Sequence, residues 1–112
     1  MTNDLWKLFL DDIRDPSDTS FVIARTVEEA QYLILNYGVP AVISFDHDLG
    51  MDGTGNLLPS GYYLAKWLVE MDMDEMIKIP LDFSFVVHSH NPIGAENIRI
   101  YLSNYLKSKN RF

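Results

Sequence analysis

The stretch VISFDHDLGMDG, residues 42 to 53, places three polar side chains directly after four residues that are typical of a buried strand. Asp46, His47 and Asp48 follow Phe45 with no residue in between. Removing a carboxylate from water costs free energy unless a partner compensates for the lost hydration. The cluster therefore requires water, a cation or a partner group at the carboxyl end of a strand.

Other apolar runs in the chain have the length and composition of buried strands. We expect strands at residues 5–10, 21–25, 41–45 and 83–87. Amphipathic helices are predicted after the last three of them, because apolar residues recur there at the spacing i, i+3, i+4, i+7. These helices are expected at residues 26–38, at residues 60–72 and from residue 91 onward.

Apolar strands that alternate with amphipathic helices favour a mainly parallel sheet with helices on both faces. We therefore predict an α/β fold, a small three-layer sandwich with a four-stranded sheet, formed by a single domain over residues 1–112. Only residues 11–20 separate the first two strands, which is short for a crossover that carries a helix. We expect a loop or a stunted helix there.

Composition excludes several classes of protein. The net charge of -7 disfavours a surface for duplex nucleic acid, which needs a footprint of lysine and arginine. The absence of cysteine rules out disulfides and thiolate metal sites. No apolar run approaches the roughly 20 residues of a membrane helix, and no signal leader is recognisable. We expect a soluble, cytoplasmic protein that does not bind membranes, and its oligomeric state stays open.

Polar side chains follow three of the four predicted strands. In open parallel sheets, ligands bind beyond the carboxyl ends of the strands, so these side chains are expected in one crevice. All three histidines of the chain belong to this group. The members are Asp11, Asp12, Asp46, His47, Asp48, His88, Ser89 and His90.

The carboxylates of this group predict a divalent cation. Like charges that converge raise one another's pKa unless a cation neutralises them. The expected ligands are Asp11, Asp12, Asp46 and Asp48. Oxygen ligands favour Mg²⁺ or Mn²⁺, and the neighbouring imidazoles allow Zn²⁺ or iron. The alternative is that Asp11 or Asp12 caps a turn or pairs with Arg14 or Arg25.

The segment HSH places His88 and His90 on the same side of an extended chain. One imidazole can then give a proton while the other takes one, although a single histidine is more typical of a hydrogen-bonded structural residue. Ser60 and Asn91 stand at predicted helix starts, where free N–H groups favour phosphate, as they do in any fold of this class. Together with Ser89 they are candidate phosphate contacts.

Four segments carry a resemblance to a known family: LFLDDIRDP, SFDHDLG, GYYLAKWL and VVHSHNPIGAENI. They resemble the cyclic-phosphate processing receiver-like family, a derived offshoot of the response-regulator receiver fold. The resemblance spans nearly the whole chain, and its specific parts are FDHDLG and HSHN. It implies a truncated receiver-like, flavodoxin-like topology.

The resemblance also implies a function, namely metal-assisted hydrolysis or processing of a cyclic phosphate, such as an RNA 2′,3′-cyclic end or a cyclic nucleotide. The four aspartates named above would hold the cation. His47, His88 and His90 would supply acid/base catalysis or phosphate contacts, and Arg14 would meet the anionic oxygens.

Two other classes of function stay open. One is a module that binds a cyclic nucleotide or another phosphorylated ligand without chemistry. The other is a degenerate receiver that signals through phosphorylation of Asp46. The receiver switch needs a lysine after a fifth strand, and the four-strand pattern of this sequence offers none, so this alternative is the less favoured one.

Overall fold

The computed structural model describes residues 6–109, which form four short strands and three helices in the predicted order. The strands are β1 (Lys7–Leu10), β2 (Phe21–Ala24), β3 (Val42–Phe45) and β4 (Ser84–Val87). The helices are α1 (Val27–Tyr37), α2 (Gly61–Met73) and α3 (Pro92–Lys109). The expected start of the first strand at Leu5 lies outside the described residues. Residues 11–20 form a loop of turns and bends, as expected.

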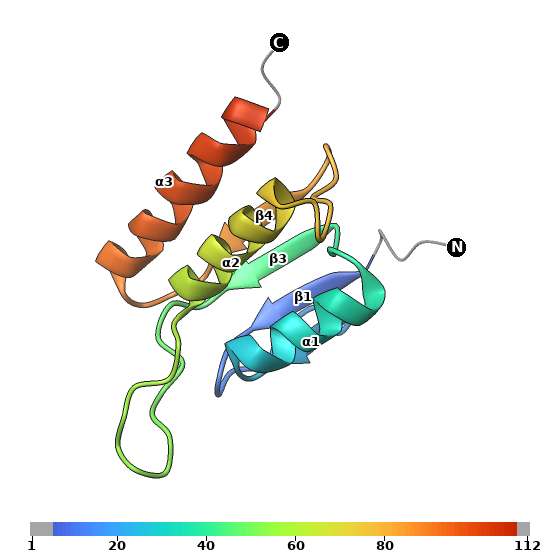
Figure 1. Cartoon of the computed structure of the whole chain (residues 1–112). Helices are drawn as coiled ribbons and strands as arrows, with labels where there is room; N and C mark the ends of the chain where they lie inside the picture. The colour runs from blue at the N-terminus through green and yellow to red at the C-terminus, as the bar shows by residue number, and fades with distance from the viewer. Residues whose placement is uncertain (1–5, 110–112) are drawn as a thin grey trace.

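The four strands form one parallel sheet in the order β2-β1-β3-β4 (Figure 1). Leu10 at the end of β1 lies beside Ala24 of β2 and Phe45 of β3, and Phe45 lies beside Val87 of β4. All four strands therefore end at the same edge of the sheet. The predicted α/β class and the receiver-like parallel topology are confirmed.

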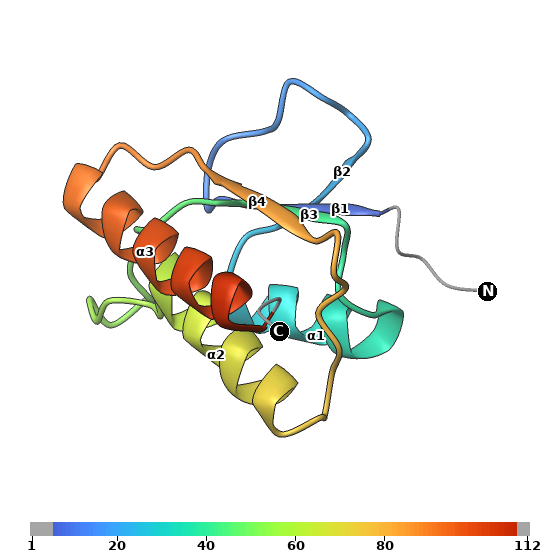
Figure 2. The same cartoon turned by 90° about the horizontal axis from the view of Figure 1, so that it is seen from above.

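The structure differs from the expectation in its layers, because all three helices cover one face of the sheet (Figure 2). The buried core joins this face, including Leu8, Leu10 and Ile43, to residues of all three helices. The crossovers through α1 and α2 run in the same direction across the sheet, so their right-handedness puts both helices on one side. The connection from β1 to β2 runs the opposite way, and it carries no helix.

The second face of the sheet is covered in part by the loop of residues 11–20 (Figure 2). Phe9 lies on this face, and its ring meets the edge of Phe21 at 6.0 Å between centroids. The ammonium of Lys7 lies 4.7 Å from the centre of the Phe21 ring. Phe9 and Phe21 explain why the sequence of the strands is typical of burial on both faces, although one face carries no helix.

The ends of α1 follow the local signals in the sequence. The hydroxyl of Thr26 accepts a hydrogen bond from the N–H of Glu29 at 3.1 Å, and the Glu29 carboxylate accepts one from the N–H of Arg25 at 2.6 Å. Gly38 ends the helix with a φ of 87°, a conformation that favours glycine. Of the helices in residues 6–109, none combines the length and the apolar character needed to cross a bilayer.

Asp72 of α2 links this helix to α3 and to the segment before β4. Its side chain is 6% exposed and accepts hydrogen bonds from the Tyr105 hydroxyl at 2.5 Å, the Ile79 N–H at 2.8 Å and the Lys109 ammonium at 2.9 Å. Burial by itself raises the pKa of Asp72, but these three donors outweigh it and lower the pKa below the usual 3.8. The carboxylate is therefore ionised in the folded protein.

Replacing Asp72 with alanine is expected to lower the free energy of unfolding at pH 7 by about 2 kcal/mol, because buried donors lose their acceptor. Urea unfolding measures this, with exposed Asp82→Ala as the control. A lowered pKa stabilises the fold above the unfolded value of 3.8 and ceases to do so as the pH falls through the folded value. The difference in unfolding free energy between the parent and the Asp72 variant should therefore shrink as the pH falls below 3.8. A difference that stays constant down to pH 2 would contradict the lowered pKa of Asp72.

Candidate functional site

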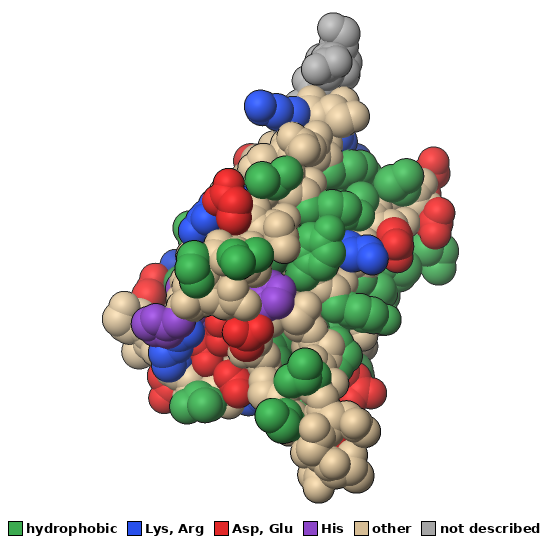
Figure 3. All heavy atoms as spheres, turned by 90° about the vertical axis from the view of Figure 1, so that its left-hand side faces the viewer, with side chains coloured by type: hydrophobic (Ala, Val, Ile, Leu, Met, Phe, Trp, Pro, Cys, Tyr) green, Lys and Arg blue, Asp and Glu red, His purple; other side chains and the backbone are tan. Residues whose placement is uncertain are grey.

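Acidic and histidine side chains gather on the face of the molecule where the strands end (Figure 3). A pocket of about 390 Å³ opens there. Its lining consists of Asp11, Asp12, Ile13, Arg14, Asp46, Asp48, Ser89, His90 and Asn91. Eight of these nine residues belong to the predicted site, and Ile13 is the ninth. The sequence was therefore able to indicate the place of the pocket and most of its lining.

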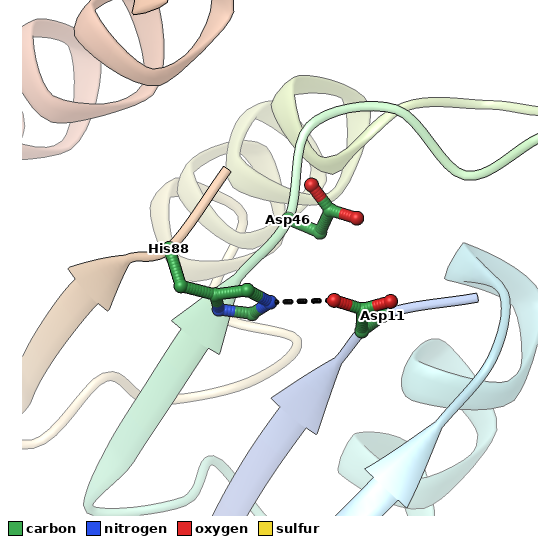
Figure 4. Close-up of side chains that lie close together, drawn as sticks. All are labelled: Asp11, Asp46 and His88. Carbon is green, nitrogen blue, oxygen red and sulfur yellow. Dashed lines mark hydrogen bonds and ion pairs between the residues drawn. The ribbon is translucent and has the colours of Figure 1, made fainter. Parts of the chain in front are cut away.

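At the pocket, Asp11, Asp46 and His88 come together from three neighbouring strands (Figure 4). Each follows the last residue of β1, β3 or β4, and one ligand atom of each lies within 4.8 Å of the other two. Figure 4 shows the Asp11 carboxylate and the His88 ring pointing toward each other. The parallel register of the sheet is what places these three side chains side by side.

Asp11 is 1% exposed and is held by four hydrogen bonds. One carboxylate oxygen, Oδ1, accepts from the N–H groups of Ile13 and Arg14, both at 2.9 Å. The other, Oδ2, accepts from Nε of Arg14 and Nε2 of His88, also at 2.9 Å. Burial by itself raises the pKa of Asp11, but these donors outweigh it and hold the pKa below its usual value. Asp11 is therefore a buried, ionised carboxylate.

His88 follows β4, and its ring is held in a fixed orientation by contacts to β3 and β1. Its ring stacks on Phe9 at 4.4 Å between centroids, and the Ser44 hydroxyl lies 2.7 Å from Nδ1. A carboxylate only accepts hydrogen bonds, so Nε2 carries the proton that it donates to Asp11. The imidazole thus has partners at both nitrogens. It supports Asp11 from below and is not among the residues of the described chain that line the pocket.

Ser44 is a site residue that the sequence analysis missed. It is 5% exposed and is the polar residue within the apolar strand VISF. Because side chains alternate along a strand, Ser44 lies on the same side of the chain as Asp46, two residues later. It is paired with Phe9 of β1, so both lie on the face of the sheet that carries no helix. A hydroxyl inside an otherwise apolar strand was the available signal.

The carboxylates of Asp46 and Asp12 have unused acceptor positions. Asp46 is buried, its Oδ1 accepts from the N–H of His47 at 2.8 Å, and its Oδ2 lies 3.6 Å from Nη2 of Arg14. Asp12 lines the pocket beside Gly50. Among residues 6–109 no side chain or backbone group hydrogen-bonds to the Asp12 carboxylate.

His47 packs against the start of α3 and is not part of the described pocket lining. Its ring packs on Gly94, where a Cβ atom would come within 2.4 Å of it, and its Nδ1 lies 2.8 Å from the Asp48 carboxylate. Ser60 precedes α2 and is likewise not part of the described pocket lining. The structure therefore places Ser60 outside the described pocket lining, and His47 reaches that lining only through its contacts with Asp46 and Asp48.

The segment after β4 supplies the polar wall of the pocket. The Asn91 side chain caps α3, because its oxygen accepts from the N–H of Gly94 at 2.9 Å. Its amide nitrogen lies 3.4 Å from the Asp48 carboxylate, and the Ser89 hydroxyl accepts from the Asn91 N–H at 3.0 Å. His90 is exposed and lines the pocket. An imidazole and a helix start thus face the carboxylates.

The sequence suggests Arg25 only as a possible ion-pair partner of Asp11 or Asp12. In the structure Arg25 has a different role. Its Nη1 donates to the backbone oxygens of Asp11 at 3.2 Å and Arg14 at 2.7 Å, and its Nη2 donates to Asp15 at 2.5 Å. These bonds fix the loop that follows β1. Arg14, by contrast, contacts the carboxylate of Asp11 itself, which is the pairing that the sequence left open.

The donor chemistry of the pocket fits a divalent cation. Carboxylate oxygens are the ligands that Mg²⁺ and Mn²⁺ prefer, and a nearby imidazole is compatible with Zn²⁺. Asp12 and Asp46 have unused oxygen lone pairs, and Asp11 lies next to Asp46 in the three-residue cluster. These three residues could hold such an ion, whereas the fourth expected ligand, Asp48, shares its carboxylate with His47 and Asn91.

The chain was compared with known proteins. A family model described as the cyclic-phosphate processing Receiver domain matches residues 6–104. Neither the curated proteins nor the solved structures contain a significant match to this chain. The family match includes every strand and all the residues that line the pocket. The chain therefore belongs to the cyclic-phosphate processing receiver family.

Proposed function

We propose that this protein hydrolyses a cyclic phosphate ester, such as an RNA 2′,3′-cyclic end or a cyclic nucleotide, with the help of a divalent cation. The observation that carries the proposal is the composition of one pocket. Buried carboxylates, the guanidinium of Arg14 and the exposed imidazole of His90 share it. This combination offers a place for a cation, a partner for phosphoryl oxygens and a proton donor.

The cation would be held by Asp46 and Asp12, with Asp11 next to Asp46. Mg²⁺ or Mn²⁺ suits this oxygen-rich set best. When bound, such an ion neutralises charge on phosphoryl oxygens and lowers the pKa of water. The residues of the chain supply the remaining parts of the reaction.

Arg14 is the residue for the anionic phosphoryl oxygens, because a guanidinium matches their geometry with paired N–H donors. Water attacks phosphorus, a new P–O bond forms, and the ring P–O bond to one ribose oxygen breaks. His90 gives a proton to that departing oxygen, and the proton released by the water passes to a pocket carboxylate such as Asp48. The product is a phosphomonoester with a free ribose hydroxyl.

Replacing His90 with glutamine is expected to reduce the hydrolysis of 2′,3′-cyclic AMP about a hundredfold, because the leaving oxygen loses its proton donor. The rate should be measured by chromatography with Mg²⁺, Mn²⁺ and Zn²⁺ in turn. The control is Arg99→Gln on α3, since Arg99 pairs with Glu96 at 3.0 Å and is not part of the described pocket lining. It should change the rate by less than about fivefold.

Equal rates for the parent and the His90 variant would overturn the role of His90. Stoichiometric binding of the cyclic nucleotide, with the ligand recovered unchanged under every metal, would instead support a non-catalytic binding module. The same chromatogram distinguishes the two results.

A further inference from the structure

Every acceptor position of Asp11 is already occupied. A carboxylate offers about four lone-pair positions, and Asp11 accepts four hydrogen bonds. Both nitrogens of His88 also have partners. Asp11 and His88 are therefore fully hydrogen-bonded, and a cation cannot use Asp11 unless one of the four donors leaves.

Arg14 bridges the two buried carboxylates. Its Nε donates to Oδ2 of Asp11 at 2.9 Å, and its Nη2 lies 3.6 Å from Oδ2 of Asp46. The positive charge thus lies between the oxygens where a divalent ion would be expected. A magnesium ion binds carboxylate oxygens at about 2.0–2.1 Å, so an ion on Oδ2 of Asp46 would come close to the guanidinium. Two cations at that separation repel each other strongly.

Of the four donors to Asp11, the Arg14 side chain is the one that can leave. The N–H groups of Ile13 and Arg14 belong to a backbone loop that Arg25 anchors. His88 is fixed by its stacking on Phe9 and by Ser44. The Arg14 side chain is 40% exposed and can turn into solvent without moving the backbone.

We propose that Arg14 is a resident cation of this pocket, which a divalent ion must displace before it binds between Asp46 and Asp11. The inference rests on the proposed function, because it assumes the same cation. It adds that the protein holds its own counter-charge in place of the ion. The displaced guanidinium is then free to meet the phosphate.

Isothermal titration calorimetry with Mn²⁺ alone tests the proposal without any catalytic readout. Arg14→Gln should bind Mn²⁺ about five to ten times more tightly than the parent, since a partly exposed ion pair no longer has to be broken. The control is Arg99→Gln on α3, where Arg99 pairs with Glu96 at 3.0 Å. That variant removes the same charge at a distance and should bind Mn²⁺ as the parent does.

The outcomes separate the two proposals. If the parent binds Mn²⁺ and Arg14→Gln binds it equally or more weakly, the resident-cation proposal is wrong and the metal site stands. If neither binds Mn²⁺, both the resident cation and the metal of the proposed function are excluded. Binding by the variant alone would support the displacement.

A measurement on the parent protein avoids any question about the folding of a variant. The N–H at Nε of Arg14 should give a separate NMR signal in the absence of metal, because it is hydrogen-bonded to buried Asp11. Saturating Mg²⁺ should shift this signal and speed its exchange with water, while the Arg99 signal stays in place. An Arg14 signal that is unchanged at saturation would overturn the proposal.

Discussion

Replacing Asp46 with asparagine is expected to reduce cyclic-phosphate hydrolysis by a factor of about 10² to 10³. Asp46 is buried at the carboxyl end of β3, and its Oδ2 is the buried carboxylate oxygen with lone pairs to spare. Asparagine has nearly the same shape, and its oxygen can still accept the hydrogen bond from the N–H of His47. The change therefore removes the charge and leaves the local geometry in place.

The exposed Asp82→Asn serves as the control, because Asp82 precedes β4 and lies outside the pocket lining. It changes the net charge by the same amount and should leave the initial rate within about twofold of the parent. An Asp46 variant that hydrolyses the substrate as fast as Asp82→Asn would contradict the proposed function. Thermal unfolding of both variants establishes that the loss is not a loss of fold.

The same aspartate distinguishes hydrolysis from the degenerate-receiver alternative. If the parent reacted with acetyl phosphate to give a stable acyl phosphate at Asp46, intact mass measurement would detect the added phosphoryl group and Asp46→Asn would lose it. Such labelling, together with no turnover of cyclic nucleotides, would favour signalling over hydrolysis.

The convergence of the site could be predicted from the sequence because it depends on topology alone. Once β1, β3 and β4 are parallel, the residues that follow them must meet at one edge of the sheet. This was enough to group Asp11, Asp46 and His88 before their neighbours were known. The strand order also explains why the residues that follow β2 do not line the described pocket. β2 is an outer strand of the sheet, and β1 separates it from β3 and β4.

The layers and the side-chain partners could not be predicted in the same way. Phe9 and Ile23 are as apolar as Leu8 and Leu10, so the pattern does not reveal that only one face of the sheet carries helices. The contact between Ser44 and His88 depends on how β3 and β4 are paired, a relation between segments 44 residues apart. A single sequence gives no measure of that register.

The direction of His47 was likewise beyond the local pattern. The imidazole turns toward α3 because two glycines allow the helices to approach the strand end. Gly61 donates its N–H to the His47 carbonyl at 2.8 Å, and Gly94 lies against the His47 ring. Both glycines lie in the helix starts that the sequence analysis considered, at Ser60 and Asn91, only as phosphate contacts. In the structure, the absence of a side chain at Gly61 and Gly94 is what lets α2 and α3 pack closely against Asp46 and His47.

Replacing Gly61 with alanine is therefore expected to lower the free energy of unfolding by about 3 kcal/mol. A Cβ atom there would lie 1.9 Å from the carbonyl oxygen of Asp46 and 3.0 Å from its carbon. These are backbone atoms, so the clash can be relieved only by moving α2 away from the strand end. The helix preference of alanine over glycine, about 1 kcal/mol, is too small to offset that cost.

Gly53→Ala is the matched control, because a Cβ atom at Gly53 would meet nothing within 4 Å. Urea unfolding of the two variants should give a free energy near that of the parent for Gly53→Ala and a clear deficit for Gly61→Ala. Since the carbonyl that clashes belongs to Asp46, the Gly61 variant should also bind Mn²⁺ more weakly under conditions where it remains folded. Equal unfolding midpoints for the two variants would mean that α2 can shift freely, and that the strand end which carries Asp46 is not held by this helix.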